Sequence, residues 1–150
     1  MAGQVWFFAY GANMSTAAMR SRSGEIADVQ VATLPNYELV FNKKARGGSA
    51  TANIRPASGS TLYGVLFRIP EAALRTLDRF EGAPEHYRRI EISVLDGRGS
   101  PVSAQAYIAT KIEKGLRPAP HYIQSILEAA AEHHFPAEYV DRLKKTAGAA

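Results

Sequence analysis

A glutamate at the end of a predicted amphipathic helix is the residue in this sequence best suited to proton transfer. Leu74, Leu77 and Glu81 are spaced i, i+3 and i+7 in a segment whose pattern predicts a helix over 70–80, so they share one helical face. The carboxylate therefore continues an apolar stripe, and it falls in the last helical turn, where the helix dipole disfavours negative charge. Both effects raise the pKa of an acid, as in a general base. In the alternative interpretation, the helix frays at Phe80 and the glutamate points into water.

A second stretch has the types of residue that bind an anion. The run from Val5 to Tyr10 is apolar on both faces, which predicts a buried strand, and Gly11 then permits a turn. Asn13 or Ser15 can cap a helix that starts within a few residues. Such a junction directs free backbone N–H groups at one point, which favours an anion such as a ligand carboxylate. A plain strand–turn–helix connection is the alternative.

Other chemistries find little support in the sequence. It contains no cysteine, which excludes disulfides and thiolate chemistry and suits a cytosolic protein. The four histidines, His86, His121, His133 and His134, do not have the spacing of metal ligands, so no metal site is predicted. The sequence has no phosphate-binding loop, no dinucleotide-binding glycine pattern and no serine nucleophile elbow.

Length and composition indicate one globular domain. The chain has 150 residues, of which 46% are hydrophobic and 21% are charged, and no run is long enough to cross a bilayer. We expect neither a signal peptide nor a membrane partner. The formal net charge is +4, but the basic groups are scattered and each is interpreted as solvated surface, including Lys43-Lys44-Arg46. Because no dense basic patch with interleaved aromatic residues is present, no nucleic-acid partner is predicted.

The predicted elements are mostly strands joined by turns, with helices inserted between them. Because strands and helices do not alternate regularly, the order argues for an α+β fold with a mostly antiparallel curved sheet or partial barrel flanked by helices. A single domain is expected over 1–150, with a frayed tail over 146–150. The predicted strands are 29–33, 37–41, 51–54, 61–69, 90–94 and 102–108, with turns at 34–36 and 58–60, a loop over 43–49, and helices over 70–80 and 121–134 and after Pro136.

Four segments resemble motifs of the γ-glutamylcyclotransferase-like family, in matching order and spacing over most of the chain. The loop Phe-Ala-Tyr-Gly-Ala-Asn-Met at 8–14 is similar to the substrate-binding loop of that family, and Leu-Asp-Arg-Phe-Glu-Gly at 77–82, followed by Tyr-Arg-Arg at 87–89, is similar to its acidic segment. Leu-Tyr-Gly-Val-Leu-Phe at 62–67 and Pro-Ala-Pro-His-Tyr at 118–122 are similar to a central strand and a late tyrosine element.

The resemblance implies the γ-glutamylcyclotransferase fold and a cofactor-independent reaction that forms 5-oxoproline from a γ-glutamyl compound and releases an amine or amino acid. It implies that Glu81 is the catalytic acid–base residue. A small γ-glutamyl substrate would be the partner, held by a set of residues from the loop and two later tyrosines: Tyr10, Gly11, Ala12, Asn13, Met14, Tyr87 and Tyr122. The expected state is a monomer or homodimer in the cytoplasm.

Ala12 stands where the family usually has serine. If the loop acts through its backbone N–H groups, alanine serves equally well, whereas a role for the hydroxyl would alter activity or substrate choice. Two alternatives to the first interpretation remain open. One is cleavage of a γ-glutamylamine in metabolite deprotection, and the other is a non-catalytic binding module with the same fold.

Overall fold

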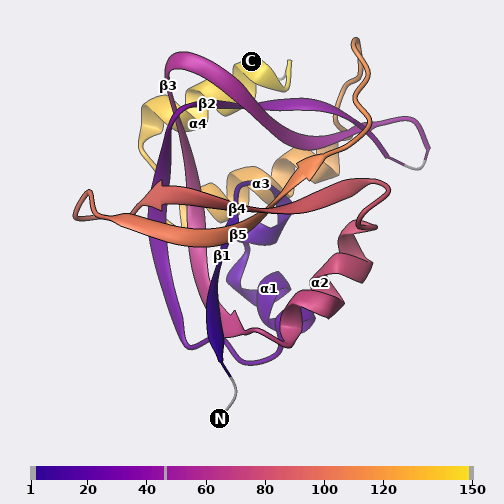
Figure 1. The fold of residues 1–150 in the computed structure, drawn as a ribbon. Coiled ribbons are helices and arrows are strands. Elements are labelled where there is room, and N and C mark those ends of the chain that lie inside the picture. The colour runs from indigo at the N-terminus through magenta and orange to yellow at the C-terminus, as the bar shows by residue number, and fades with distance from the viewer. Residues whose placement is uncertain (1–2, 46, 149–150) are drawn as a thin grey trace.

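The structure is a computed structural model that describes residues 3–45 and 47–148. Its strands close into a barrel in the order β1-β3-β2-β4-β5, in which β1 and β5 pair parallel and the other neighbours pair antiparallel. The predicted α+β class and antiparallel sheet are confirmed, and the barrel is closed rather than partial (Figure 1). In chain order the elements are β1 (Gln4–Ala9), the short 3-10 helix η1 (Ala12–Met14), α1 (Thr16–Ser23), β2 (Asp28–Lys44), β3 (Ala50–Pro70), α2 (Ala73–Glu81), β4 (Tyr87–Leu95), β5 (Pro101–Ala109), α3 (Pro120–Glu132) and α4 (Ala137–Thr146).

The second half of β1 is buried on both faces, as its sequence predicts, whereas Val5 and Trp6 are half-buried. Phe7 and Phe8 point to opposite faces of the strand and are 1% and 0% exposed. The strand lies between β3 and β5, and its register pairs Phe8 with Leu66 of β3. A Cβ added to Gly64 of β3 would lie 2.5 Å from the Phe8 ring and from the Ala9 carbonyl oxygen. Glycine at this position therefore lets the Phe8 side chain and the end of β1 lie directly over β3.

The two longest strands, β2 and β3, correct the sequence interpretation. The predicted turns at 34–36 and 58–60 lie inside these strands, and the four short predicted strands on either side of them merge into two. A register shift between Pro35 and Tyr37 absorbs the irregularity, with Asn36 at φ 63°. The Asn36 side-chain oxygen accepts a hydrogen bond from Gly59 N–H at 3.1 Å. These residues bend the β2–β3 ribbon without ending it, and Figure 1 shows the ribbon curving at the top of the view.

The helix that carries the candidate base, α2, begins three residues later than predicted. Pro70 is the last residue of β3, where it pairs with Gln4, and it does not start the helix. Leu74 is 6% exposed and Leu77 is fully buried, so the predicted apolar face is the buried one. Gly82 ends the helix in the left-handed conformation, at φ 69°, as its position predicts.

The remaining elements largely match the sequence pattern. The β4–β5 hairpin has the expected alternation, with Ile92 paired to Ala104, and α3 and α4 are separated at Pro136. Thr146 ends α4, and Ala147 is 9% exposed, so these two positions of the predicted frayed tail are ordered parts of the fold; the last two, 149–150, lie outside the described residues. None of the helices in the described part of the chain is long and apolar enough to cross a membrane.

Candidate active site

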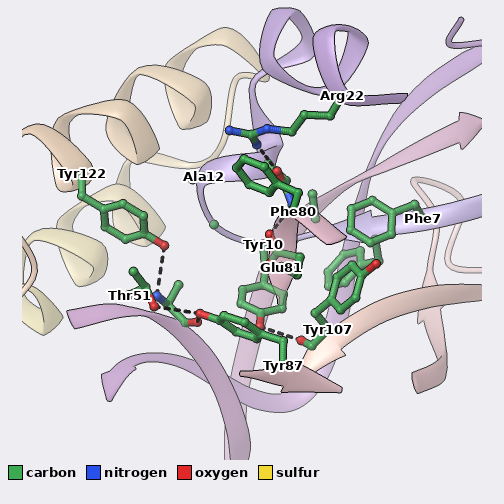
Figure 2. A pocket seen from close by; sticks show the side chains of 15 residues that line it. Phe7, Tyr10, Ala12, Arg22, Thr51, Phe80, Glu81, Tyr87, Tyr107 and Tyr122 are labelled. Carbon is green, nitrogen blue, oxygen red and sulfur yellow. Dashed lines mark hydrogen bonds between the residues drawn. The ribbon is translucent and has the colours of Figure 1, made fainter. Parts of the chain in front are cut away.

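A cavity of about 360 Å³ lies where the end of β1, the end of α2 and the first turn of α3 come together. Figure 2 shows its tyrosines, Glu81 and Arg22 converging on the same space from different elements. Aromatic side chains supply much of the wall. The described residues that line it are Phe7, Phe8, Ala9, Tyr10, Gly11, Ala12, Asn13, Arg22, Thr51, Ala52, Phe80, Glu81, Tyr87, Tyr107 and Tyr122.

The loop after β1 supplies backbone donors to this cavity. Met14 N–H donates to the Gly11 carbonyl at 3.0 Å, which closes the single turn of η1. The N–H groups of Gly11, Ala12 and Asn13 donate to no acceptor among the described residues, and all three residues line the cavity. Ser15 caps α1 by accepting from Ala18 N–H at 3.2 Å. Because none of these three N–H groups has an acceptor among the described residues, they are candidate donors for an anionic ligand, and the predicted anion-binding turn stays a prediction.

Glu81 enters the cavity from the last turn of α2. The helix does not fray at Phe80, and the carboxylate lines the cavity instead of pointing away from it. Burial raises the pKa of Glu81 above its ordinary value of 4.5, and a hydrogen bond from Asn13 and the charge of Arg22 oppose this shift only in part. Among the described residues that line this cavity, Glu81 alone carries a carboxylate. A proton acceptor whose pKa is moved toward neutrality therefore shares the cavity with the loop.

Arg22 connects the loop to the carboxylate. Its guanidinium donates to the Asn13 side-chain oxygen, and the Asn13 side-chain nitrogen lies 3.4 Å from Glu81 Oε2. The guanidinium carbon also lies 3.7 Å from the centre of the Phe80 ring, a cation–π contact visible in Figure 2. The oxygen of the Asn13 amide is thus occupied by Arg22, which turns the amide nitrogen toward Glu81.

Three tyrosines form the polar wall on the other side of the cavity. Tyr10 donates to the Tyr107 carbonyl at 2.6 Å, and Tyr87 donates to the Ala52 carbonyl at 2.7 Å. The Tyr122 hydroxyl accepts from Ala52 N–H at 3.0 Å, so its own proton remains available to a ligand. Burial raises the pKa of Tyr122 to about 12 and moves the pKa values of the other two upward as well. The phenols therefore stay neutral at physiological pH and can act as hydrogen-bond donors.

A brace behind the cavity fixes the position of α2. The Tyr107 hydroxyl donates to Asp78 Oδ1 at 2.6 Å, and Arg89 forms an ion pair with the same carboxylate at 2.8 Å. Burial acts to raise the pKa of Asp78, but the hydrogen bonds from Arg89 and Tyr107 outweigh it and hold the pKa below its usual value. Asp78 lies one helical turn before Glu81 on α2. These two contacts therefore hold the helix that carries Glu81 against β4 and β5.

The structure brings together all but one of the residues that the sequence singled out. Met14 is fully buried in the core and is not among the residues that line the cavity, whereas the other seven predicted substrate-binding and catalytic residues are. Sequence reasoning missed Arg22, Tyr107 and Phe80. A signal for Tyr107 was present, because the alternation of Ala106 with Ile108 already places it on the opposite face of β5.

We predict that Gly11→Val weakens substrate binding more than it weakens the fold. A Cβ at Gly11 would lie 3.0 Å from the Ala52 Cβ and 3.6 Å from the Tyr122 hydroxyl oxygen, inside the cavity. The φ of Gly11 is −128°, so crowding of the site, and not a left-handed backbone, explains the glycine. We expect KM to rise about a hundredfold or more, which corresponds to about 2.7 kcal/mol of binding free energy, and the free energy of unfolding to fall by about 1 kcal/mol, the low end for overpacked sites, because the added methyl groups enter a cavity. Steady-state kinetics and thermal melting measure the two effects.

Gly97→Val is the matched control for this substitution. Gly97 lies in the β4–β5 hairpin, and a Cβ there has no described atom within 4 Å. KM should not change in this variant. An unchanged KM in Gly11→Val, together with an unchanged melting temperature, would contradict the role assigned to the loop.

Comparisons with known proteins show which family this chain belongs to. The chain is 31% identical over 144 residues to a human protein named gamma-glutamylcyclotransferase, an alignment that covers 92% of this chain and 76% of the human one. The chain belongs to the γ-glutamylcyclotransferase family. The model of the AIG2-like family also matches residues 61–143.

Similarity to a solved structure extends over nearly the whole chain, and a further relative is similar over part of it. A solved structure named gamma-glutamyl cyclotransferase is similar with a TM-score of 0.87 at 28% identity, covering 95% of this chain and 87% of that one. A zebrafish (Danio rerio) protein named gamma-glutamylaminecyclotransferase B is 34% identical over 58 residues, 37% of this chain and 30% of that protein. The resemblance read from four short motifs is therefore confirmed at the level of the family and the fold.

Proposed function

We propose that this protein is an enzyme that converts a small γ-glutamyl compound into 5-oxoproline and a free amine or amino acid. The observation that supports this most is the position of Glu81, a half-buried carboxylate that shares one cavity with three residues whose backbone N–H groups have no acceptor in the described part of the chain. A γ-glutamyl group carries an α-carboxylate and an α-ammonium on the same carbon. The cavity offers donors for the first and a proton acceptor for the second.

In the proposed binding mode, the N–H groups of Gly11, Ala12 and Asn13 bind the α-carboxylate of the substrate. Because these are backbone donors, Ala12 serves as well as the serine that is usual in the family. The Tyr122 hydroxyl, whose proton has no acceptor among the described residues, donates to a second oxygen of the substrate. Aromatic walls on both sides exclude water from the reacting atoms, which strengthens these hydrogen bonds.

In the proposed reaction, Glu81 accepts a proton from the α-ammonium, and the resulting amine attacks the γ-carbonyl carbon of the same molecule. The new C–N bond closes a five-membered ring, and the bond to the leaving nitrogen breaks. Of the three protons on the ammonium, one stays on the ring nitrogen and two pass through Glu81 to the released amine, which leaves as an ammonium. The attack is intramolecular, so orientation and proton transfer supply most of the catalysis, and we propose that no cofactor takes part.

The raised pKa of Glu81 suits this role. An acceptor works best when its pKa approaches that of the proton donor, and the α-ammonium is a much weaker acid than an ordinary carboxylic acid. Burial of Glu81 narrows the difference between its pKa and that of the α-ammonium. It also brings the pKa of protonated Glu81 closer to that of the leaving nitrogen, to which the proton is returned. Asn13, held by Arg22, keeps the carboxylate oriented toward the cavity.

A panel of γ-glutamyl compounds tests the proposal. The panel combines γ-glutamyl amino acids with γ-glutamylamines, since the partial similarity to a gamma-glutamylaminecyclotransferase favours the amines as a second candidate class. We expect equimolar 5-oxoproline and free amine, both quantified by mass spectrometry, from at least one class. Formation of glutamate would point to hydrolysis, and binding without any product would point to a non-catalytic module. We further propose a cytoplasmic location, which fractionation of the native cells can test.

A further inference from the structure

The third helix, α3, reaches the loop after β1 from both of its ends. Tyr122, in its first turn, lines the cavity. His133 caps the other end of α3 and is not among the described residues that line the cavity, but its Nε2 atom lies 2.7 Å from the carbonyl oxygen of Met14. A carbonyl oxygen can only accept, so the imidazole donates this hydrogen bond. His133 therefore joins the end of α3 to the last residue of the loop, across a sequence separation of 119 residues.

The Met14 carbonyl lies between two turns of backbone hydrogen bonding. Met14 is fully buried and ends η1, where its N–H donates to the Gly11 carbonyl at 3.0 Å. The next residue, Ser15, caps α1, and the Ser15 carbonyl accepts from Met19 N–H at 2.9 Å. A buried carbonyl at such a junction needs a donor from elsewhere in the fold, and His133 supplies that donor.

The imidazole is itself held in place by aromatic packing. The His133 side chain is only 8% exposed. Its ring centre lies 6.3 Å from that of Phe67 in an edge-on arrangement and 6.4 Å from that of Phe135. Phe67 pairs with Phe7 in the register of β3 with β1, and β1 leads directly into the loop. His133 therefore connects the loop to α3 and to the barrel wall at the same time.

We propose that His133 is a positioning residue that holds the loop at 11–13 in the conformation that binds the α-carboxylate of the substrate. This inference rests on the proposed function, in which the backbone N–H groups of that loop bind the carboxylate. Met14 directly follows Asn13, so a shift of the Met14 carbonyl reorients the adjoining peptide groups and moves the donors. The sequence singled out Met14 for substrate binding, and its side chain does not line the cavity. In this proposal Met14 acts through its backbone, which His133 fixes.

Two variants that differ in one hydrogen-bond donor test this role. His133→Gln and His133→Met have side chains of similar length, but only the glutamine has N–H groups, on an atom as many bonds from Cα as Nε2 of histidine. We expect KM for a γ-glutamyl substrate to rise about tenfold or more in His133→Met, where a buried acceptor loses its donor, and to stay within about threefold of wild type in His133→Gln. In both variants kcat should change by less than about threefold, because the loop holds the ground state and the transition state alike. A general weakening of the fold would instead lower the apparent kcat through loss of folded protein, with KM unchanged.

Binding of 5-oxoproline gives a second measurement. Its carboxylate should occupy the same loop, so its Kd, measured by calorimetry, should rise in His133→Met by about the same factor as KM. His134→Asn is the matched control, because His134 is the neighbouring histidine, is exposed, and has φ 58°, a conformation that asparagine also adopts. KM and Kd should not change in this control.

The outcomes separate the positioning role from the proposed function. An unchanged KM in His133→Met, or an equal rise in His133→Gln and His133→Met, overturns the positioning role while the cyclotransferase reaction stands. Failure of the wild-type protein to form 5-oxoproline from any γ-glutamyl compound overturns the proposed function and the positioning role with it. If His133→Met does not fold, as melting curves would reveal, His133→Ala takes its place, and an unchanged KM in that variant overturns the proposal.

Discussion

Glu81→Gln is expected to lower turnover of γ-glutamyl substrates by about a hundredfold or more, while the protein remains folded. Glutamine has the shape of glutamate, and its side-chain oxygen can still accept the hydrogen bond from Asn13, but it cannot accept a proton. Loss of a general acid–base group costs about 10²–10⁴ in rate. Measurements of kcat and KM for a γ-glutamyl substrate should therefore show the loss mainly in kcat.

Glu85→Gln is the matched control. Glu85 is exposed, lies four residues from Glu81 and is not among the described residues that line the cavity. Its substitution should leave kcat and KM unchanged. A Glu81→Gln variant with normal turnover beside an inactive Glu85→Gln variant would show that the base is misassigned, and full activity in both would refute the mechanism.

The raised pKa of Glu81 also predicts how activity and stability depend on pH. Catalysis needs the carboxylate, so kcat/KM should rise with pH through a pKa above 4.5. Between 4.5 and the raised value, the folded protein holds more protons at this site than the unfolded chain does. Stability contributed by this group therefore falls as pH rises through that window and then stays constant.

Melting temperatures of the Glu81→Gln variant and of the wild type give a direct test of this sign. At neutral pH the variant lacks the cost of a buried charge and should melt at the same or a higher temperature. The difference in melting temperature should vanish below pH 4.5, where Glu81 is protonated in the folded and in the unfolded protein. A Glu81→Gln variant that melts at a lower temperature than the wild type at neutral pH would contradict this sign. It would mean that the folded protein stabilises Glu81 as a carboxylate.

An N-acetylated γ-glutamyl substrate is expected to give no detectable turnover, a loss of about a thousandfold or more. Acetylation removes the amine that attacks the γ-carbonyl, and with it the advantage of an intramolecular nucleophile, which reaches about 10⁵–10⁸ M in effective concentration. The α-carboxylate remains, so the compound can still occupy the loop of Gly11, Ala12 and Asn13. Free amine and 5-oxoproline are the quantities to measure, with the unmodified substrate as control.

Release of free amine from the acetylated compound at the normal rate would contradict the cyclisation. The accompanying product would then be N-acetylglutamate, formed with water as the nucleophile. Competitive inhibition by the acetylated compound separates loss of reaction from loss of binding. Together with Glu81→Gln, this substrate tests both proton acceptor and nucleophile, because one change is made in the protein and the other in the substrate.

Features that depend on neighbours along the chain were determined by the sequence alone. Leu74, Leu77 and Glu81 share a face because helical spacing requires it, and Gly82 ends the helix because glycine adopts the left-handed conformation at low cost. Ser15, named as a cap, does cap α1. The family motifs also lie in short continuous segments, so the loop at 10–13 and the glutamate could be assigned before their distance in space was known.

Only the tertiary structure decided where turn-forming residues end a strand and which charged groups are buried. Asn36 and Gly59 favour turns locally, but the long β2–β3 pairing outweighs that preference, since many ladder hydrogen bonds would otherwise be lost. Closure of the barrel depends on the parallel contact of β1 with β5, whose partners, Phe7 and Gln105, are far apart in sequence. Lys43, which the sequence assigned to solvated surface, is only 6% exposed, and Arg22 donates to the side chain of Asn13. Both placements follow from long-range contacts, which local spacing does not encode.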